Sequence, residues 1–254
     1  MGHLRATAKL IVLLIVTAEY YLCYVTALPF VGAFPKARLW WRRWAFSNWA
    51  RRVARVLGLR INARNIQPNA PFLLVSNHLS YVDIIVLESL ADCAFVAKSE
   101  VAGWPVAGLI CRTMDTIFID RKMKRDIPRA LAKIEKALTR GMGIVLFAEA
   151  TSTNGTSVAP FKSSLLEFAA SKRVPVHYAT ISYATPATAT PAQESVCWWG
   201  DMTFSGHLFR LLRLRSFEAD VVYGPEPIVA EDRHVLAARL WSAVSSQLAP
   251  AAHR

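Results

Sequence analysis

The sequence predicts an α/β layered domain with a mostly parallel or mixed central sheet flanked by helices, preceded by an N-terminal membrane-embedded helical segment. After residue 60, short apolar runs alternate with stretches whose apolar residues recur at helical spacing, as in layered domains. Residues 10–34 are instead almost continuously apolar, and 254 residues suit one globular domain with a short appendage. We therefore expect a membrane anchor and interfacial helix at residues 1–58 and the globular domain at residues 59–254.

The composition combines strong positive charge with an excess of apolar residues. The net charge is +12, and hydrophobic residues make up 54% of the chain. An anionic membrane surface would account for both properties, whereas a nucleic-acid partner would account for the charge alone. We therefore expect membrane lipids, and no nucleic acid, as partners. The four cysteines lie far apart with no C-x-x-C pair, which indicates buried reduced thiols in a cytoplasm-facing domain.

The N-terminal apolar stretch is long enough to span a bilayer from Leu10 to Leu28. It lacks the small-residue cleavage site of a signal peptide. Glu19 lies in its middle, where a charge is costly, and Pro29 is expected to end any helix. Three alternatives stay open, namely one spanning helix, a helical hairpin that dips into one leaflet, and a buried core helix.

Residues 36–60 (KARLWWRRWAFSNWARRVARVLGLR) contain seven arginines, four tryptophans and no acidic residue. Tryptophan and arginine together suit the headgroup layer of a membrane, so we expect an interfacial helix. The alternative is a solvated basic helix that packs on the domain. If the preceding segment spans, the positive charge predicts an inner-membrane protein whose globular domain faces the cytoplasm.

The globular part begins with a predicted strand at residues 72–76 (FLLVS), a short apolar run, followed by a helix at residues 81–90. Further strands are predicted at residues 94–98 and 116–120. Between them, residues 103–113 indicate a short helix with a proline near its start.

The second half of the chain continues this alternation. A helix is predicted over residues 127–138, because apolar residues recur at helical spacing while lysine and arginine line the opposite face. Residues 144–148 (IVLFA) indicate a buried strand. The remaining predicted elements are a helix at 161–171, strands at 174–183 and 217–224, and a closing helix at 231–248.

Polar residues follow several of these strands directly. Asn77-His78, Asp120-Arg121 and Glu149 each come just after a predicted strand. Because ligand sites in such sheets lie at the carboxyl ends of strands, we expect these residues to converge on one site.

His78 and Asp83 lie five residues apart, so they need not share one helix. A histidine after a strand and an aspartate in the next helical turn can form a hydrogen bond that fixes the ring tautomer and makes the other nitrogen a better base. Such a pair would serve as a general base for a hydroxyl. On spacing alone, however, a structural turn is the better explanation.

Other chemistries have weaker support. Ser76 and Ser80 flank His78, but the chain contains no G-x-S-x-G nucleophile elbow. Neighbouring positions in sequence do not align a nucleophile with its base. A metal held by His78, Asp83 and Glu149 would need another ligand, and no second histidine falls at ligand spacing. We therefore predict neither a covalent intermediate nor a metal site.

Three further positions could bind an anionic or polar substrate. Arg121 follows a strand and begins a basic run that suits a phosphate. Glu149 leads into a loop of small residues at 147–157, where a substrate could approach backbone amides closely. Lys98 follows a third strand. The simpler alternatives are that the basic run is a solvated loop, that Glu149 caps the next element, and that Lys98 is a surface lysine.

Together these residues resemble the glycerolipid acyltransferase family, typified by 1-acyl-glycerol-3-phosphate acyltransferase. The match covers roughly residues 60–225 in the family's order and spacing. It comprises NHLSYVD with Asn77, His78 and Asp83, TIFIDR with Phe118, Asp120 and Arg121, FAEATS with Phe147, Glu149 and Thr151, and RVPVHYATI with Val174 and Pro175. Four ordered motifs reverse the balance in favour of a catalytic pair.

The resemblance implies an O-acyltransferase of membrane phospholipid biosynthesis. In that family, His78 would deprotonate the free hydroxyl of a lysolipid such as 1-acyl-glycerol-3-phosphate, with Asp83 orienting its ring. The hydroxyl would attack an acyl thioester, from acyl-CoA or acyl carrier protein as co-substrate, with no cofactor and no acyl-enzyme. Arg121 and Glu149, with Thr151 and more weakly Lys98, would hold the head group, supported by the motif residues Asn77, Phe118 and Asp120.

The third motif departs from the family pattern. Ala148 and Ala150 replace a proline and a glycine, and Ser152 stands where many phosphatidate-forming members carry an arginine for the acceptor phosphate. Losing that ligand would cost a phosphomonoester acceptor a few kcal/mol of binding energy, on the order of 2–3. The runs at 151–164 and 198–207 look closer to bacterial members of the family that act on lyso-ornithine lipid or other lysolipids. Such an acceptor, and a non-catalytic lipid-binding protein on the same fold, are the alternatives. The sequence leaves oligomeric state and acyl-chain preference open.

Overall fold

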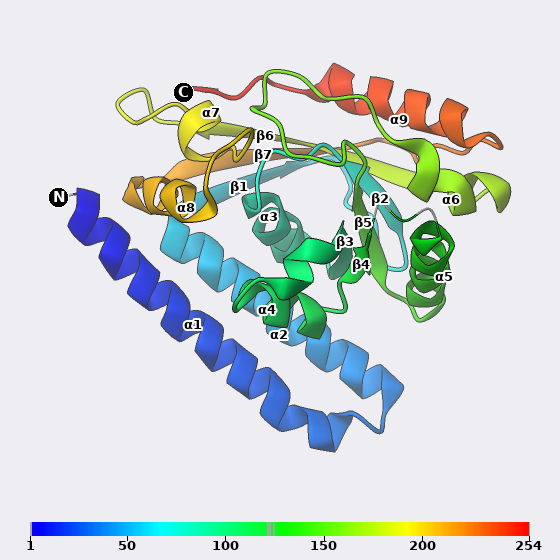
Figure 1. Cartoon of the computed structure of the whole chain (residues 1–254), viewed down its shortest axis with the longest axis horizontal. Coiled ribbons are helices and arrows are strands. Elements are labelled where there is room, and N and C mark those ends of the chain that lie inside the picture. The colour runs from blue at the N-terminus through cyan, green and yellow to red at the C-terminus, as the bar shows by residue number, and fades with distance from the viewer. Residues whose placement is uncertain (1, 121–122, 124, 254) are drawn as a thin grey trace.

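The computed structural model describes residues 2–120, 123 and 125–253, and it confirms a layered α/β fold with a mixed central sheet (Figure 1). The strand order is β1-β7-β6-β2-β5-β3-β4, with β8 beside β6. Neighbours pair in parallel except β6 with β7. The strands are β1 (Leu59–Arg64), β2 (Leu73–Ser76), β3 (Cys93–Lys98), β4 (Ile117–Ile119), β5 (Gly143–Phe147), β6 (Val176–Thr185), β7 (Phe217–Tyr223) and β8 (Ala252–His253).

Helices cover both faces of the sheet. Because side chains alternate along a strand, Val145 and Phe147 of β5 face one apolar cluster while Ile144 and Leu146 face the other. The first face carries α1 (Gly2–Val31), α2 (Pro35–Leu57), α3 (Val82–Leu90), α4 (Ala107–Thr113) and α8 (Phe204–Arg213). The second carries α5 (Asp126–Thr139), α6 (Glu167–Ser171) and α9 (Arg233–Gln247). The short α7 spans Ala192–Ser195, and the 3-10 turns η1 and η2 span Ser99–Gly103 and Ser163–Leu166.

The predicted strands are all present, and so are the predicted helices at 81–90, 127–138 and 231–248, with ends that differ by a few residues. The predicted helix at 161–171 is instead η2 followed by the single turn of α6. The helix predicted at 103–113 begins only at α4, after Val106 adopts a φ of 60°. The sequence did not predict β1, β8, α7 or α8.

The expectation that Pro29 ends the first helix is wrong, because α1 continues to Val31. Proline removes one backbone donor, and in the last turn of a helix this removes little of the remaining hydrogen-bond ladder. A short turn then leads into α2, which runs back along α1 (Figure 1).

A buried arginine fastens α2 to the domain. Arg42 is 2% exposed, and its guanidinium donates to Asp92 Oδ1 at 2.6 Å, to Cys93 O at 2.9 Å and to Met114 O at 2.8 Å. An ion pair this deep is retained only when its hydrogen bonds are made. Arg42 is therefore not one of the arginines that could contact head groups. Trp40 and Trp44, on either side of Arg42 in the sequence of the same helix, do remain exposed.

Helix α1 is long and apolar enough to cross a membrane. Much of its apolar surface is open to solvent, including the largely exposed Leu4, Ile11, Ile15, Leu22 and Phe30. Exposed apolar side chains that gather on one helix mark an interaction surface. On a helix long enough to cross a bilayer, they indicate association with a membrane.

Candidate active site

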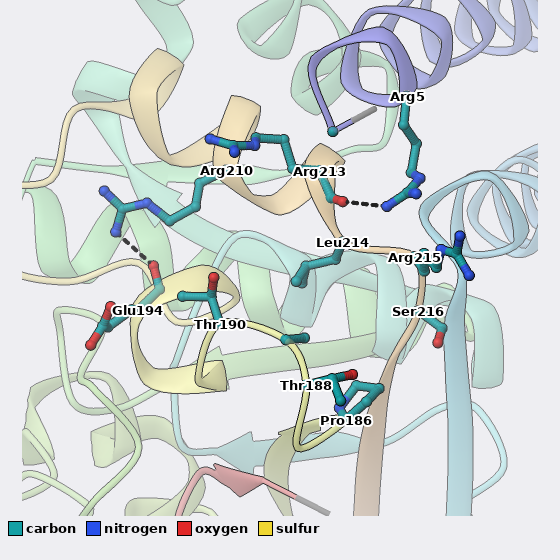
Figure 2. Close-up of a pocket in the computed structure, with 12 residues that line it drawn as sticks. Arg5, Pro186, Thr188, Thr190, Glu194, Arg210, Arg213, Leu214, Arg215 and Ser216 are labelled. Carbon is teal, nitrogen blue, oxygen red and sulfur yellow. Dashed lines mark hydrogen bonds between the residues drawn. The ribbon is translucent and has the colours of Figure 1, made fainter.

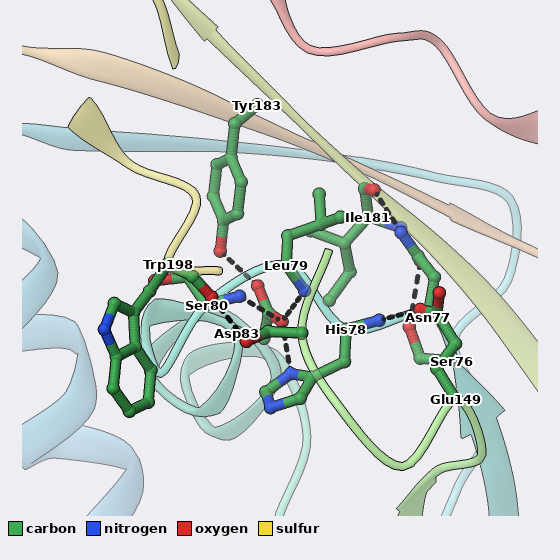
Figure 3. Close-up of polar contacts among 11 residues, drawn as sticks. Ser76, Asn77, His78, Leu79, Ser80, Asp83, Glu149, Ile181, Tyr183 and Trp198 are labelled. Carbon is green, nitrogen blue, oxygen red and sulfur yellow. Dashed lines mark hydrogen bonds and ion pairs between the residues drawn. The ribbon is translucent and has the colours of Figure 1, made fainter. Parts of the chain in front are cut away.

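The loop between β2 and α3 brings His78 against Asp83 (Figure 3). His78 lies two residues after β2, and Asp83 is in the first turn of α3. The ring Nδ1 of His78 lies 2.7 Å from Asp83 Oδ2. The sequence predicted this contact, and the structure shows that it joins a loop residue to a helical residue.

The carboxylate of Asp83 is completely buried and held by four donors. Besides His78, Oδ2 accepts from the backbone N–H of Leu79 at 2.7 Å and of Ser80 at 3.0 Å. The hydroxyl of Tyr183, on β6, donates to Oδ1 at 2.7 Å. Burial, with Asp83 nearby, raises the pKa of Tyr183, so this phenol stays a donor. Hydrogen bonds to both oxygens hold the carboxylate in one orientation.

The outer face of His78 is left for a substrate. Its side chain is 23% exposed, and the ring stacks on Phe147 with centroids 4.1 Å apart. In the described part of the chain, Nε2 receives no hydrogen bond, and Figure 3 shows it on the side of the ring away from Asp83. Because Asp83 accepts the proton on Nδ1, Nε2 is the nitrogen with a free lone pair.

Asn77 pairs with the backbone of β6 and has a structural role. It is fully buried, its Nδ2 donates to Ile181 O at 2.9 Å, and its Oδ1 accepts from Ile181 N at 2.8 Å. These bonds continue the pairing of β2 with β6, which ends at Ser76 opposite Ala179. Asn77 therefore sets the point at which the backbone turns out of the sheet and presents His78.

The Glu149 carboxylate accepts hydrogen bonds from the backbone of the His78 loop and of the loop after β5. It is 3% exposed, its Oε1 accepts from His78 N at 2.6 Å, and its Oε2 accepts from Ala159 N at 2.6 Å. Burial raises the pKa of Glu149 to about 7, although the two amide N–H groups oppose that shift. Both contacts shown in the structure are thus to backbone, and a head-group role for Glu149 remains a prediction.

Two further loops contact the backbone of the His78 segment. Thr153 N donates to His78 O at 2.9 Å, and Trp198 N donates to Leu79 O at 2.8 Å. The hydroxyl of Ser152 donates to the carbonyl of Trp198. The residue that stands in place of the family's arginine is therefore engaged in holding two loops together.

Aromatic side chains that the sequence analysis did not single out form one wall beside this loop. The rings of Tyr81, Trp104, Trp198 and Phe204 contact one another at centroid distances from 5.1 to 6.2 Å. The hydroxyl of Tyr81 lies 3.0 Å from Nδ1 of His207 on α8. Burial lowers the pKa of His207 to about 4, so this histidine is neutral at physiological pH. The run at 198–207 was the one sequence signal that pointed here.

The other predicted residues lie at the same edge of the sheet. Lys98 is exposed at the end of β3, which pairs with β4 opposite Ile119, and Phe118 lies within β4. The N–H of Asp120 donates to Asp126 Oδ2 at 2.7 Å. Thr151 is exposed on the loop after β5. Arg121 lies outside the described residues.

An apolar cavity of about 320 Å³ opens at this edge. It is lined by Val96, Ile119, Leu146 and Phe147, and by both altered motif positions, Ala148 and Ala150. Ala150 has a φ of 67°, the left-handed region that glycine adopts without strain, which explains why the motif has glycine there. Phe147, which also stacks on His78, is one of the residues that line this cavity. Among the described residues no group of three metal-ligating side chains occurs.

Comparison with known proteins agrees with this geometry. A model of the acyltransferase family matches residues 60–182. The chain is 36% identical over 204 residues to the lyso-ornithine lipid O-acyltransferase of Rhizobium meliloti, which covers 76% of this chain and 69% of that protein. It is 32% identical to the enzyme of the same name from Brucella abortus, over 92% of both chains.

More distant matches bear a second name. The 1-acyl-sn-glycerol-3-phosphate acyltransferase of Neisseria gonorrhoeae is 26% identical, over 70% of this chain and 69% of that protein. The crystal structure of a 1-acyl-sn-glycerophosphate acyltransferase from Thermotoga maritima superposes with a TM-score of 0.58 at 18% identity. The superposition covers 94% of this chain and 97% of that one. That structure shares the fold of this chain.

Proposed function

The chain belongs to the acyltransferase family, and from that premise we propose that it transfers a fatty acyl group from a thioester to the hydroxyl of a lysolipid, with lyso-ornithine lipid as its preferred acceptor. The observation that carries the acyl-transfer chemistry is the 2.7 Å contact between His78 Nδ1 and Asp83 Oδ2, which leaves Nε2 free at a partly exposed face.

The proton moves from the acceptor to His78 and then to the leaving thiol. As the acceptor oxygen attacks the thioester carbon, Nε2 takes the hydroxyl proton, and Asp83 stabilises the imidazolium that forms. The tetrahedral intermediate collapses with cleavage of the C–S bond, and the thiolate takes the proton back from Nε2. His78 ends the cycle neutral, and no bond to the protein forms.

The choice of acceptor rests on Ser152 and on the relatives. A phosphomonoester head group needs a cation, and arginine provides it in bidentate form. The Ser152 hydroxyl instead donates to the Trp198 carbonyl, so this position offers no charge to a phosphate. An ornithine head group carries an ammonium and a carboxylate and does not require that arginine. The Rhizobium meliloti and Brucella abortus relatives, which match over three quarters or more of this chain, are both named for lyso-ornithine lipid.

We propose that no cofactor takes part beyond the acyl donor, which is acyl-CoA or acyl carrier protein. Among the predicted head-group residues, Thr151 and Lys98 are exposed at the edge of the sheet that carries His78. Each is therefore placed to contact an acceptor, whereas Glu149 would act by holding the His78 loop.

For the membrane arrangement, we propose that α1 lies in one leaflet of the inner membrane with the catalytic domain on the cytoplasmic side. Lys9 Nζ donates to Leu57 O at 2.6 Å and to Leu214 O at 2.9 Å, and further along α1 the Tyr24 ring packs on Phe46 of α2 at a centroid distance of 4.9 Å. A helix held by the domain at its start and by α2 farther along does not leave them to cross a bilayer. Its exposed apolar side chains suit the acyl boundary.

The acceptor is tested by thiol release from acyl-CoA with purified full-length protein in detergent micelles. We expect kcat/KM with lyso-ornithine lipid to exceed that with 1-acyl-glycerol-3-phosphate by about tenfold or more, the value of one lost charge-assisted contact. A preference for the phosphate acceptor would contradict the assignment. Absence of turnover with every lysolipid and either donor would contradict acyl transfer itself.

A further inference from the structure

A cavity outside the active site lies at the end of α8 that leads to β7 (Figure 2). Its volume is about 770 Å³. Four arginines line it, Arg5 from α1, Arg210 and Arg213 from α8, and Arg215 from the turn before β7. We call this cavity the arginine pocket. None of its residues entered the mechanism above.

The charges in the arginine pocket are not neutralised. Within the described chain, none of the four guanidinium groups lies within ion-pairing distance of a carboxylate. Arg5 donates to Arg213 O at 2.8 Å and Arg210 to Glu194 O at 2.9 Å, both backbone carbonyls. Glu194 also lines the pocket, so the lining carries four positive charges and one negative charge. The net positive charge of this concavity concentrates anions there.

The end of α1 adds to this preference. Gly2 lines the pocket at the N-terminal end of a long helix, where the macrodipole is positive. Two threonines and a serine supply neutral donors around the same cavity. The pocket thus combines guanidinium, hydroxyl and helix-end contacts, which is the chemistry that binds phosphates.

Helix α8 links the arginine pocket to the active site. His207 near its start contacts Tyr81 of the His78 loop. Arg210 and Arg213 follow at three-residue intervals and so lie along one side of the helix. At about 1.5 Å per residue, Arg213 lies about 9 Å beyond His207. One rigid element therefore runs from the catalytic loop to the pocket.

We propose that the arginine pocket binds the phosphate groups of acyl-CoA while the thioester lies at His78. This rests on the proposed function. CoA carries a diphosphate and a 3′-phosphate at the far end of a long flexible arm, so its charges must be held well away from the reacting carbon. A concave pocket of about 770 Å³ has room for a nucleotide and far exceeds a single phosphate. A carrier protein would instead present one phosphate on a convex surface.

The test uses the full-length double variant Arg213→Gln/Arg215→Gln in detergent micelles. In the described structure the side chains of these two arginines make no recorded hydrogen bond or ion pair, and the bond from Arg5 goes to the backbone of residue 213. The control is Arg173→Gln/Arg233→Gln, which makes the same charge change. Arg173 follows α6 and Arg233 is the first residue of α9, and Figure 1 shows α6 at the opposite end of the sheet from α8.

Calorimetric titration with CoA, dephospho-CoA and pantetheine gives the first readout. We expect the wild type and the control to bind CoA most tightly and pantetheine most weakly. The Arg213→Gln/Arg215→Gln protein should lose about tenfold or more in affinity for CoA, the value of one charge-assisted contact. Its affinity for pantetheine should match that of the wild type.

Kinetics give the second readout. The KM for acyl-CoA should rise about tenfold in the arginine variant, and the ratio of variant to wild-type KM should approach one with acyl-pantetheine. A wild type that binds CoA no better than pantetheine would overturn the proposal, as would equal losses for both donors. Weaker binding to phosphatidylglycerol vesicles with unchanged CoA affinity would assign the pocket to anionic lipid and overturn it too. If the protein bound CoA through this pocket but acylated no lysolipid, the proposed function would be wrong and the assignment of the pocket would stand.

Discussion

Replacing His78 with alanine is expected to lower kcat for acyl transfer by about 10³-fold, the usual contribution of a general base. The substitution removes the nitrogen that would take the acceptor proton, while the Asp83 carboxylate keeps its contacts to Leu79 N, Ser80 N and Tyr183. Turnover is measured as thiol release with saturating acyl-CoA and lysolipid.

The fold should survive this change. His78 is partly exposed and stacks on one face of Phe147 only, so its removal leaves little cavity. Circular dichroism and the thermal transition check that expectation. The matched control is His234→Ala at the start of α9, an exposed histidine whose Nδ1 contacts Ser163 Oγ. It should turn over at the wild-type rate. A His78→Ala protein that did the same would remove His78 from the mechanism.

Replacing Asp83 with asparagine is expected to lower kcat by about 10²-fold or more, with little change in the KM for either substrate. The two backbone N–H groups at Oδ2 require an oxygen there, so the new amide nitrogen must face Tyr183, whose hydroxyl then accepts. His78 keeps its tautomer, but the negative charge that stabilises its protonated form is gone.

Tyr183→Phe is the matched comparison, because it leaves Asp83 charged and removes only the donor at Oδ1. We expect a loss of stability of about 1–3 kcal/mol from the unpaired buried oxygen, seen as a lower urea midpoint, and a decrease in kcat of less than tenfold. If Tyr183→Phe were as slow as Asp83→Asn, the charge of Asp83 would not be the important feature. Asp83 would then act only through the shape of the loop.

The elements that the sequence predicted are those with a strong local signal. Buried strands such as β2 and β5 are short apolar runs, and α5 has four apolar residues at helical spacing. Strand β1 was missed because only its first residue is buried, so its pattern LRINAR alternates weakly. Helix α8 follows a loop that contains Trp198, Trp199 and Gly200, and no side-chain hydrogen bond caps its start.

The site shows the same division between local and long-range information. His78 and Asp83 lie in one short segment and could be paired from spacing and motif. Tyr183 is 100 residues away in the chain and reaches Asp83 only because β6 lies beside β2 in a fixed register. The positions of Asn77 and Glu149 could be read from the motifs, but their backbone partners could not, since those partners depend on how two distant loops meet. The arginine pocket brings together Arg5 of α1 and Arg213 of α8, which are 208 residues apart in the chain, and no local sequence pattern predicts it.

Covalent catalysis is the chemical alternative to direct transfer. Burial raises the pKa of the Cys197 thiol, which makes it a poor nucleophile. The Ser80 hydroxyl is fully buried, out of reach of a bulky thioester. Neither the Cys197 thiol nor the Ser80 hydroxyl is therefore a good nucleophile. The group that His78 activates is accordingly expected to be the hydroxyl of the acceptor.

The claim that the acyl group passes directly to the acceptor, with His78 as the base, is tested most directly by rapid mixing. Thiol release from acyl-CoA is measured with and without lysolipid. If His78 is a base for the acceptor hydroxyl, wild-type protein should release thiol only when lysolipid is present. No acyl group should then remain on the protein after quenching. A burst of thiol equal to the protein concentration in the absence of lysolipid, with the acyl group recovered on a side chain, would contradict direct transfer through His78 and Asp83.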